Sequence, residues 1–302
     1  QVVRSIKGLE NAHITRPGYA IEYDFLDPRD LKHSLETRFI HNLFFAGQIN
    51  GTTGYEEAGA QGLLAGLNAA RRAKALEAWS PRRDEAYLGV LVDDLITMGT
   101  KEPYRMFTSR AEFRLSLRAD NADQRLTPIG IEAGCVGTER QRAFEAKMER
   151  LNAATSLLTS EKYTPKHLAA NGLKINQDGT KRTGFQLLAF PDVNFETLVG
   201  LNQALGVVDA ETRAQLEKDA LYANYITRQK QDVEMMKRDE AHEIPKGFPF
   251  QGIEGLSNEL KNKLSAAQPS NLAQASRVDG VTPAALTLIL ARLRKDKREK
   301  SA

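Results

Sequence analysis

The spacing of apolar residues separates the chain into a first part that mixes strands and helix and a longer part that is mainly helical. Within residues 1–78, short apolar runs such as 43–46 alternate with glycine-rich turns, and an alanine-rich stretch from about 58 to 78 follows them. Short apolar runs between glycines predict buried strands, and a long alanine-rich run predicts a helix. We therefore expect an α/β unit that ends at Ser80-Pro81.

Helical periodicity dominates after residue 81. The first apolar stripe has the i, i+3, i+4, i+7 spacing of a buried helix face and consists of Leu88, Leu91, Val92 and Leu95. A long helix is predicted from 210 to about 238. Its inward residues would be Leu216, Ala220, Ala223, Ile226 and Val233.

Three short helices are predicted near the C-terminus, after a linker at 242–250 that contains two prolines. They would begin near Ser257, Ser270 and Thr282. In the last of them Thr282 can cap the helix, and Pro283 suits the first helical position. Its buried face would consist of Leu286, Ile289, Leu290 and Leu293.

The sequence pattern at 109–118 is typical of a helix start in its first residues and of a strand in the rest. Ser109 and Glu112 have the spacing of a helix capping box, whereas residues 113–118 alternate between apolar and polar side chains at strand period. We predict one helical turn followed by a strand, on which Arg114 and Arg118 would share a face.

Length and composition narrow the class of protein. The chain has 302 residues with 41% apolar and 27% charged residues, values typical of a soluble globular protein of about two domains. The periodicity divides it further, into sections 1–79, 80–219 (mixed, mostly helical) and 220–302. No apolar run approaches the roughly 20 residues that cross a bilayer, so we expect no membrane association and a cytoplasmic location.

A single cysteine limits the chemistry of the chain. Cys135 cannot form an intrachain disulfide, and one cysteine excludes a cysteine-based metal cluster, so no metal site is expected. Its apolar neighbours predict a small, buried structural residue. The chain begins at Gln1 without methionine, and its first recognisable element lies in the middle of a motif. We therefore expect a fragment that lacks an upstream segment.

Residues 43–57 have the order of a ligand-binding turn: an apolar strand, a glycine-rich loop and the start of a helix. The start of a helix offers unpaired N–H groups and a partial positive charge, and Gly47, Gly51 and Gly54 let the backbone approach a bound group. A phosphate or an electron-rich ring edge would fit such a turn. Glu56, Glu57 or Asp24 could act as acids or bases, although surface carboxylates near a helix start more often serve as capping or dipole partners.

This order resembles the second FAD-contacting segment of glutathione-reductase-type flavoproteins. Most such proteins have an aspartate that bonds the ribityl chain where this chain has Gln48, and a neutral amide can also bond a hydroxyl. The string Gly-Gln-Ile-Asn-Gly-Thr-Thr-Gly-Tyr-Glu-Glu at 47–57 is similar to the motif of the MnmG/GidA family, in which this glutamine contacts FAD. The similarity extends over residues 16–24, 99–112, 120–126 and 275–284 and is weakest over 151–210.

The resemblance implies an α/β remnant of a glutathione-reductase-type FAD-binding domain followed by a mainly α-helical domain. The residues expected to bind FAD are Gly47, Gln48, Asn50, Gly51, Thr52, Gly54, Tyr55 and Glu56. No Gly-x-Gly-x-x-Gly follows a strand in this chain, so the ADP-binding half of the dinucleotide fold is missing from it. The family's nucleophilic cysteines and NADH-binding insert are also expected upstream, which leaves the catalytic residues unknown and predicts that this chain alone is inactive.

The resemblance also implies an activity for the complete protein. FAD would pass reducing equivalents from NADH, and a methylene-folate would supply a one-carbon unit to C5 of the wobble uridine of certain tRNAs. An amine or glycine would complete the aminomethyl or carboxymethylaminomethyl group, together with the GTPase MnmE. The C-terminal helical section at 220–302 is implied to bind MnmE, and the protein is implied to be a homodimer.

A basic, aromatic-rich window follows the second predicted helix. Arginine pairs with phosphate oxygens, and arginine and aromatic planes stack on unpaired bases, as recognition of an anticodon loop requires. The residues expected to contact tRNA are Lys101, Arg105, Arg110, Arg114 and Arg125. The alternative from charge alone is a solvated face whose arginines pair with nearby carboxylates.

Two other functions remain open at this stage. The chain could be a non-catalytic RNA-binding and adaptor module, which flavin absorbance would distinguish from an enzyme. It could also belong to the related folate- and FAD-dependent tRNA uridine methyltransferases, although these are expected to lack the long helical section after residue 81.

Overall fold

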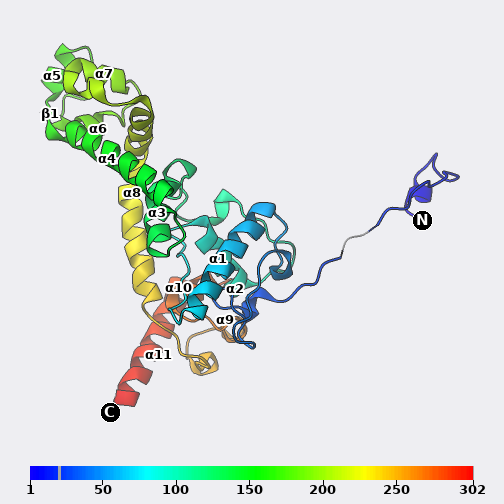
Figure 1. Ribbon diagram of the computed structural model, residues 1–302. Helices are drawn as coiled ribbons and strands as arrows, with labels where there is room; N and C mark the ends of the chain where they lie inside the picture. The colour runs from blue at the N-terminus through cyan, green and yellow to red at the C-terminus, as the bar shows by residue number, and fades with distance from the viewer. Residues whose placement is uncertain (20–21, 302) are drawn as a thin grey trace.

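The computed structural model describes residues 1–19 and 22–301, with side chains up to Asp296. Two long helices, α4 (Thr138–Ser160) and α8 (Ala210–Glu240), connect an outer lobe to the main body of the molecule. The N-terminal residues extend away from the body, and the last helix, α11 (Pro283–Ser301), projects from its opposite end (Figure 1). The mainly helical architecture confirms the helical part of the sequence prediction.

The described residues of the first section form no sheet, and its helix α1 (Tyr55–Ala73) packs with the first helix of the next section, α2 (Tyr87–Met98), to make their shared core. The short turns η1 (Val3–Ser5), η2 (Pro28–Asp30) and η3 (Gln48–Asn50) precede them. The strand predicted at 43–46 was wrong: among the described residues of 1–79 only isolated bridges occur, such as Glu36 with Phe44. A strand needs a neighbouring strand to complete its hydrogen bonds, so this apolar run instead packs on the core of α1 and α2.

Helix α1 is shorter at its C-terminal end than the alanine-rich run predicted. It ends at Ala73, and Ala75 then has a left-handed φ of 55°. The N–H of Leu76 bonds the carbonyl of Arg71, which closes the helix as in a Schellman motif. Helix α2 buries the predicted stripe, with Leu91, Val92 and Leu95 almost fully covered.

Residues 108–118 form turns, and the predicted capping box and strand were both wrong. The turn η4 (Thr108–Arg110) has no side-chain cap from Ser109, and the N–H groups of Ser116 and Leu117 both bond the carbonyl of Phe113. The carboxylate of Glu112 is held by Arg83 at 2.8 Å instead of reaching back to the helix start. A partner 29 residues away therefore overrides the local spacing.

The outer lobe has its own hydrophobic core. Its two short strands, β1 (Lys162–Tyr163) and β2 (Arg182–Thr183), pair antiparallel. Its helical elements are α4, α5 (Pro165–Ala170), α6 (Gly184–Leu187), α7 (Phe195–Leu201), η6 (Gln203–Val207) and the first half of α8. Its buried side chains include Leu158, Leu168, Leu187, Phe195, Leu198 and Leu205. Helix α8 begins with Asp209 as its cap, and Leu216 and Ala220 are buried as predicted. The predicted inward residues farther along α8 are only half-buried, because this part of the helix spans the space between lobe and body.

The turn η5 (Ala119–Asn121) leads into α3 (Ala122–Glu132), and Cys135 follows that helix. Cys135 is exposed, so its predicted burial was wrong. Gly134 has a left-handed φ of 75°, and the N–H of Cys135 bonds the carbonyl of Gly130. Cys135 thus belongs to the cap that ends α3, where its side chain points outward rather than into a core.

The C-terminal section forms a third core. It comprises η7 (Phe250–Gly252), α9 (Asn258–Ala267), α10 (Leu272–Arg277) and α11. The three helices begin near Ser257, Ser270 and Thr282 as predicted, and Thr282 caps α11 as predicted. Ser257 caps α9, and Asn271 caps α10. The stripe on α11 also faces the core, with Ile289 and Leu293 buried and Leu286 and Leu290 packed against them. No helix in the described part of the chain is long and apolar enough to span a membrane.

A buried arginine joins the helices of the body. Arg83 is 4% exposed, and its guanidinium donates to Asp94 at 2.6 Å, to Asp93 at 3.1 Å and to Glu112 at 2.8 Å. Burial alone would lower the pKa of Arg83, but the charges of the three carboxylates outweigh it and raise the pKa. The guanidinium therefore stays charged and holds α2 against the segment that contains Glu112.

The same network reaches the C-terminal section. Asp93 also accepts from Arg277 at 2.8 Å and lies 3.6 Å from His33, whose ring contacts Gln274 at 3.3 Å. Burial would raise the pKa of Asp93, but the hydrogen bond with His33 and the charge of Arg277 lower it. Asp93 is therefore the shared partner of residues from three parts of the chain.

We predict that Arg83→Met lowers the free energy of unfolding by about 3–5 kcal/mol, the range for breaking a buried ion pair, because Asp93 and Asp94 lose a buried partner. Chemical denaturation followed by circular dichroism measures this loss. Arg82→Met is the matched control: the pairs of Arg82 with Asp84 and Glu85 are more exposed and should contribute less than about 1 kcal/mol. Equal, small losses for both variants would contradict a stabilising role for the buried network.

Candidate cofactor turn and basic segment

The glycine-rich turn at 47–57 is organised by one buried side chain, that of Gln61. Its Oε1 accepts from the backbone N–H of Gly47 at 3.2 Å and from Asn50 Nδ2 at 2.8 Å. Its Nε2 donates to Thr52 Oγ1 at 2.8 Å and to the carbonyl of Glu57 at 3.2 Å. Four hydrogen bonds from one fully buried amide therefore fix the path of the turn.

Glycine is required at the centre of the turn. Gly51 has a left-handed φ of 84°, and a Cβ built there would lie 2.5 Å from Thr100 Oγ1. Gly47 also has a left-handed φ, of 86°. The short turn η3 lies between these two glycines, so any side chain at either position would be strained. Both glycines are therefore needed for the shape of the turn.

Several predicted cofactor residues face outward from this turn. Gln48 and Glu56 are exposed, and the ring of Tyr55 is 93% exposed at the start of α1. Asn50 and Thr52 are instead fully buried and serve the turn itself: Asn50 donates to the carbonyl of Phe45, and Thr52 donates to the carbonyl of Gly47. The predicted set therefore divides into an outward group and an inward, shaping group.

The charges at the helix start favour a neutral acceptor over a phosphate group. Gly54 precedes α1 without a side-chain cap, so no capping side chain occupies the N–H groups of the first turn. Glu56 and Glu57 add negative charge there, which opposes a phosphate but permits a neutral carbonyl acceptor. Within the described chain, Asn50 Oδ1 is buried without a hydrogen-bond partner, which marks an unsatisfied acceptor in the turn.

The basic segment is attached directly to this turn. The N–H of Tyr104 donates to the carbonyl of Gly51 at 2.8 Å, and Tyr104 and Thr52 form a parallel bridge. The N–H of Met106 donates to the carboxylate of Glu57 at 2.9 Å. Residues 104–106 are thus held beside the turn by their backbone.

The structure places the predicted RNA-binding residues in two settings. Lys101, Arg105, Arg110 and Arg114 are exposed. The guanidinium of Arg110 lies 4.4 Å from the centre of the Tyr104 ring, and its Nε donates to the carbonyl of Arg105 at 2.8 Å. Arg125 is partly buried.

The guanidinium of Arg125 is engaged inside the protein. It donates to Asn121 at 2.9 Å and to the carbonyls of Glu85 and Arg118, and burial together with the charge of Arg118 lowers its pKa. Arg114 and Arg118 do not share a strand face, because Arg118 is itself buried and pairs with Asp120 at 3.0 Å and with Asp219. The surface available to a nucleic acid here is therefore that of residues 101–114.

The organising roles of Gln61 and Arg83 were not predicted from the sequence. Gln61 could have been found, because a glutamine that shares a helix face with Leu64 and Ala65 is a polar residue in a buried position and needs partners. Arg83 gave no such local signal, because its partners are 10 to 29 residues away. No group of side chains suited to a metal ion occurs within the described part of the molecule.

Comparisons with known families and structures cover most of the chain. A family model described as "Glucose inhibited division protein A" matches residues 1–77. Models described as the C-terminal helical domain and the C-terminal helical bundle of "tRNA modifying enzyme MnmG/GidA" match residues 138–230 and 232–302.

Two crystal structures of GidA from Aquifex aeolicus are similar to the chain. The form II crystal structure is 38% identical with a TM-score of 0.75 and aligns over 96% of this chain and 46% of the Aquifex chain. The form I structure has the same identity and coverage with a TM-score of 0.72. The chain thus spans less than half the length of this relative. Three family models along the sequence and the likeness to a solved GidA show that the chain belongs to the MnmG/GidA family of tRNA-modifying enzymes.

Proposed function

We propose that this chain is part of an FAD-dependent enzyme that modifies the wobble uridine of certain tRNAs at C5, together with the GTPase MnmE. The product would carry an aminomethyl or carboxymethylaminomethyl group. One observation carries the proposal: two hydrogen bonds join the glycine-rich turn to the basic, aromatic segment. The N–H of Tyr104 donates to the carbonyl of Gly51, and the N–H of Met106 donates to the carboxylate of Glu57. A cofactor on the turn and an RNA on the segment would therefore meet.

When bound, FAD would supply the redox chemistry, with NADH and a methylene-folate as co-substrates of the complete enzyme. The residues of this chain would bind and orient. Gln48 and the first turn of α1 would hold the flavin side of the cofactor, while Gln61 keeps the turn in shape. The exposed cations of residues 101–114 would hold the phosphates of the tRNA. We further propose a homodimer that acts in the cytoplasm.

In a full-length GidA protein that carries these residues, Gln48→Ala should weaken FAD binding by about 0.5–1.5 kcal/mol, the contribution of one neutral hydrogen bond. Titration of the apoprotein with FAD, followed by flavin fluorescence, measures the change. Gln203→Ala provides the matched control, because Gln203 is an exposed glutamine in the outer lobe. Unchanged FAD affinity for Gln48→Ala would remove this side chain from the cofactor site.

For the RNA segment, Arg105→Ala and Lys101→Ala should each weaken tRNA binding and lower the salt slope of log K by a little under one, the loss of about one phosphate contact. Both residues are exposed, so FAD content should not change. Fluorescence anisotropy of labelled tRNA at increasing salt gives the slope. Arg140→Ala, which removes an exposed arginine from α4, should leave it unaltered. Wild-type affinity and slope for both segment variants would show that residues 101–114 are only a solvated surface.

For the partner, we place the MnmE contact on the outward face of α11. Deleting residues 255–302 would also expose the core residues Ile244, Phe248 and Phe250, so a surface change is the cleaner test. The double variant Thr287→Arg/Ala291→Arg adds bulk and charge to exposed positions one turn apart and should abolish co-purification with MnmE. Ala146→Arg on the exposed face of α4 should retain the partner. Co-purification of MnmE with the double variant would place the interface elsewhere.

A further inference from the structure

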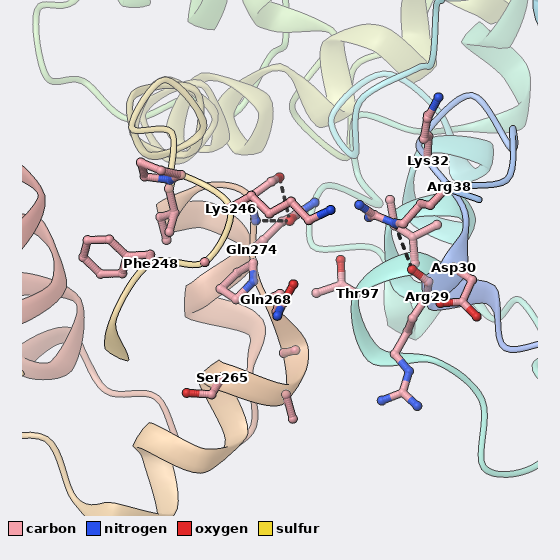
Figure 2. A pocket seen from close by; sticks show the side chains of 18 of the residues that line it. Arg29, Asp30, Lys32, Arg38, Thr97, Lys246, Phe248, Ser265, Gln268 and Gln274 are labelled. Carbon is pink, nitrogen blue, oxygen red and sulfur yellow. Dashed lines mark hydrogen bonds between the residues drawn. The ribbon is translucent and has the colours of Figure 1, made fainter. Parts of the chain in front are cut away.

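A cavity with a cationic lining lies between the first section and the C-terminal section. It has a volume of about 920 Å³ and is bounded by residues 27–39, the end of α2, the linker after α8 and the segment 265–274 (Figure 2). Four cationic side chains line it, against two acidic ones, Asp27 and Asp30. The cations are Arg29, Lys32, Arg38 and Lys246. We refer to it as the basic cavity.

Two of these cations retain charge that no carboxylate neutralises in the described chain. Arg29 pairs with Asp27, and Lys32 pairs with Glu36 at 2.6 Å. Arg38 bonds only backbone carbonyls, through Nε at 3.1 Å to those of Arg29 and Leu31, so its terminal nitrogens stay free of ion pairs. Lys246 is exposed, and no described carboxylate lies within ion-pair distance of it.

The unneutralised pair converges across the cavity. Figure 2 shows Arg38 and Lys246 extending toward one another from opposite walls. Two like charges that face each other are unfavourable on their own, and an anion between them reverses the sign of the interaction. Gln268 and Gln274 lie on the wall of Lys246 and add neutral polar groups. Arginine, lysine and side-chain amides together are the groups that bind phosphate oxygens in nucleic-acid complexes.

The basic cavity and the basic segment are close in the sequence. Ile96 and Thr97 line the cavity at the end of α2, and Lys101 and Arg105 follow a few residues later in the chain. The side chain of Arg29 packs on the intervening Gly99, where an added Cβ would lie 3.0 Å from Arg29 Nε. The end of α2 therefore leads from the lining of the basic cavity into the basic segment. This arrangement suits an extended polyanion rather than a single small ion.

We propose that the basic cavity binds the sugar-phosphate backbone of an RNA, with a phosphate between Arg38 and Lys246, as a second contact region beyond residues 101–114. The inference rests on the proposed function, because the RNA would be the same tRNA. Such a contact would place one RNA strand against both the first section and the C-terminal section of the chain.

Lys246 gives the sharpest test, because it is exposed and its replacement removes no internal bond. We expect Lys246→Glu to weaken binding of an unmodified tRNA transcript by about tenfold or more, the loss of one charge-assisted hydrogen bond, and to lower the salt slope. Lys246→Arg should retain the affinity, because a guanidinium also pairs with phosphate. Lys166→Glu is the matched control, since Lys166 is an exposed lysine on α5 of the outer lobe. Fluorescence anisotropy gives the affinities, and circular dichroism verifies that all variants are folded.

The outcomes separate this proposal from the proposed function. All variants are made in the full-length GidA protein that carries these residues, and if that protein binds no tRNA without any substitution, both proposals fail. If Arg105→Ala weakens binding while Lys246→Glu matches the wild type, the basic cavity is not an RNA site and the proposed function stands. Free phosphate is the alternative ligand for the same cations, and titration with inorganic phosphate alone tests it. If phosphate binding is saturable and Lys246→Glu abolishes it while tRNA affinity stays unchanged, the basic cavity is a site for free phosphate. That result would overturn the proposed RNA contact.

Discussion

The need to keep a buried arginine in contact with carboxylates fixes how the body of this protein is arranged. Arg83 lies before α2, and its partners come from α2 and from Glu112. A buried charge that loses its partner is costly, so these elements cannot move independently without exposing or orphaning it. Through Asp93 the same constraint reaches Arg277 and the C-terminal section. Three separated parts of the sequence thus share one electrostatic anchor.

The candidate site is held by a second, smaller network of hydrogen bonds, which is connected to the Arg83 network. The turn at 47–57 has no neighbouring strands in the described chain to hold it, and the buried amide of Gln61 takes over that role. Tyr104 connects the turn to the Arg83 network, because its backbone N–H donates to the carbonyl of Gly51 and its hydroxyl donates to Asp94 at 2.8 Å. The position of the basic segment beside the turn is therefore set by both the turn and the charge network.

The sequence correctly predicted those elements that are determined by residues close to one another in the chain. Helices with a cap and an apolar stripe, such as those after Ser257 and Thr282, lie where the sequence placed them. The errors share a different cause: the strand at 43–46 lacks a partner strand, and the capping box at Ser109 fails because Glu112 serves Arg83. For the site, the glycines and the exposed cations could be inferred from residue types. Arg125 could not be separated from them, because its internal partners at Glu85 and Arg118 are set by tertiary structure.

The basic cavity adds a second link between sections that Arg277 and Asp93 already join. Without an anion, Arg38 and Lys246 point like charges toward one another across the cavity, which opposes the close packing of the two sections that the ion pair of Arg277 favours. With an RNA phosphate between them, the same two side chains would favour that packing. If the proposed RNA contact forms, RNA affinity and the docking of the C-terminal section would therefore change together. A partner bound to α11 could alter RNA binding through this coupling without any contact to the RNA.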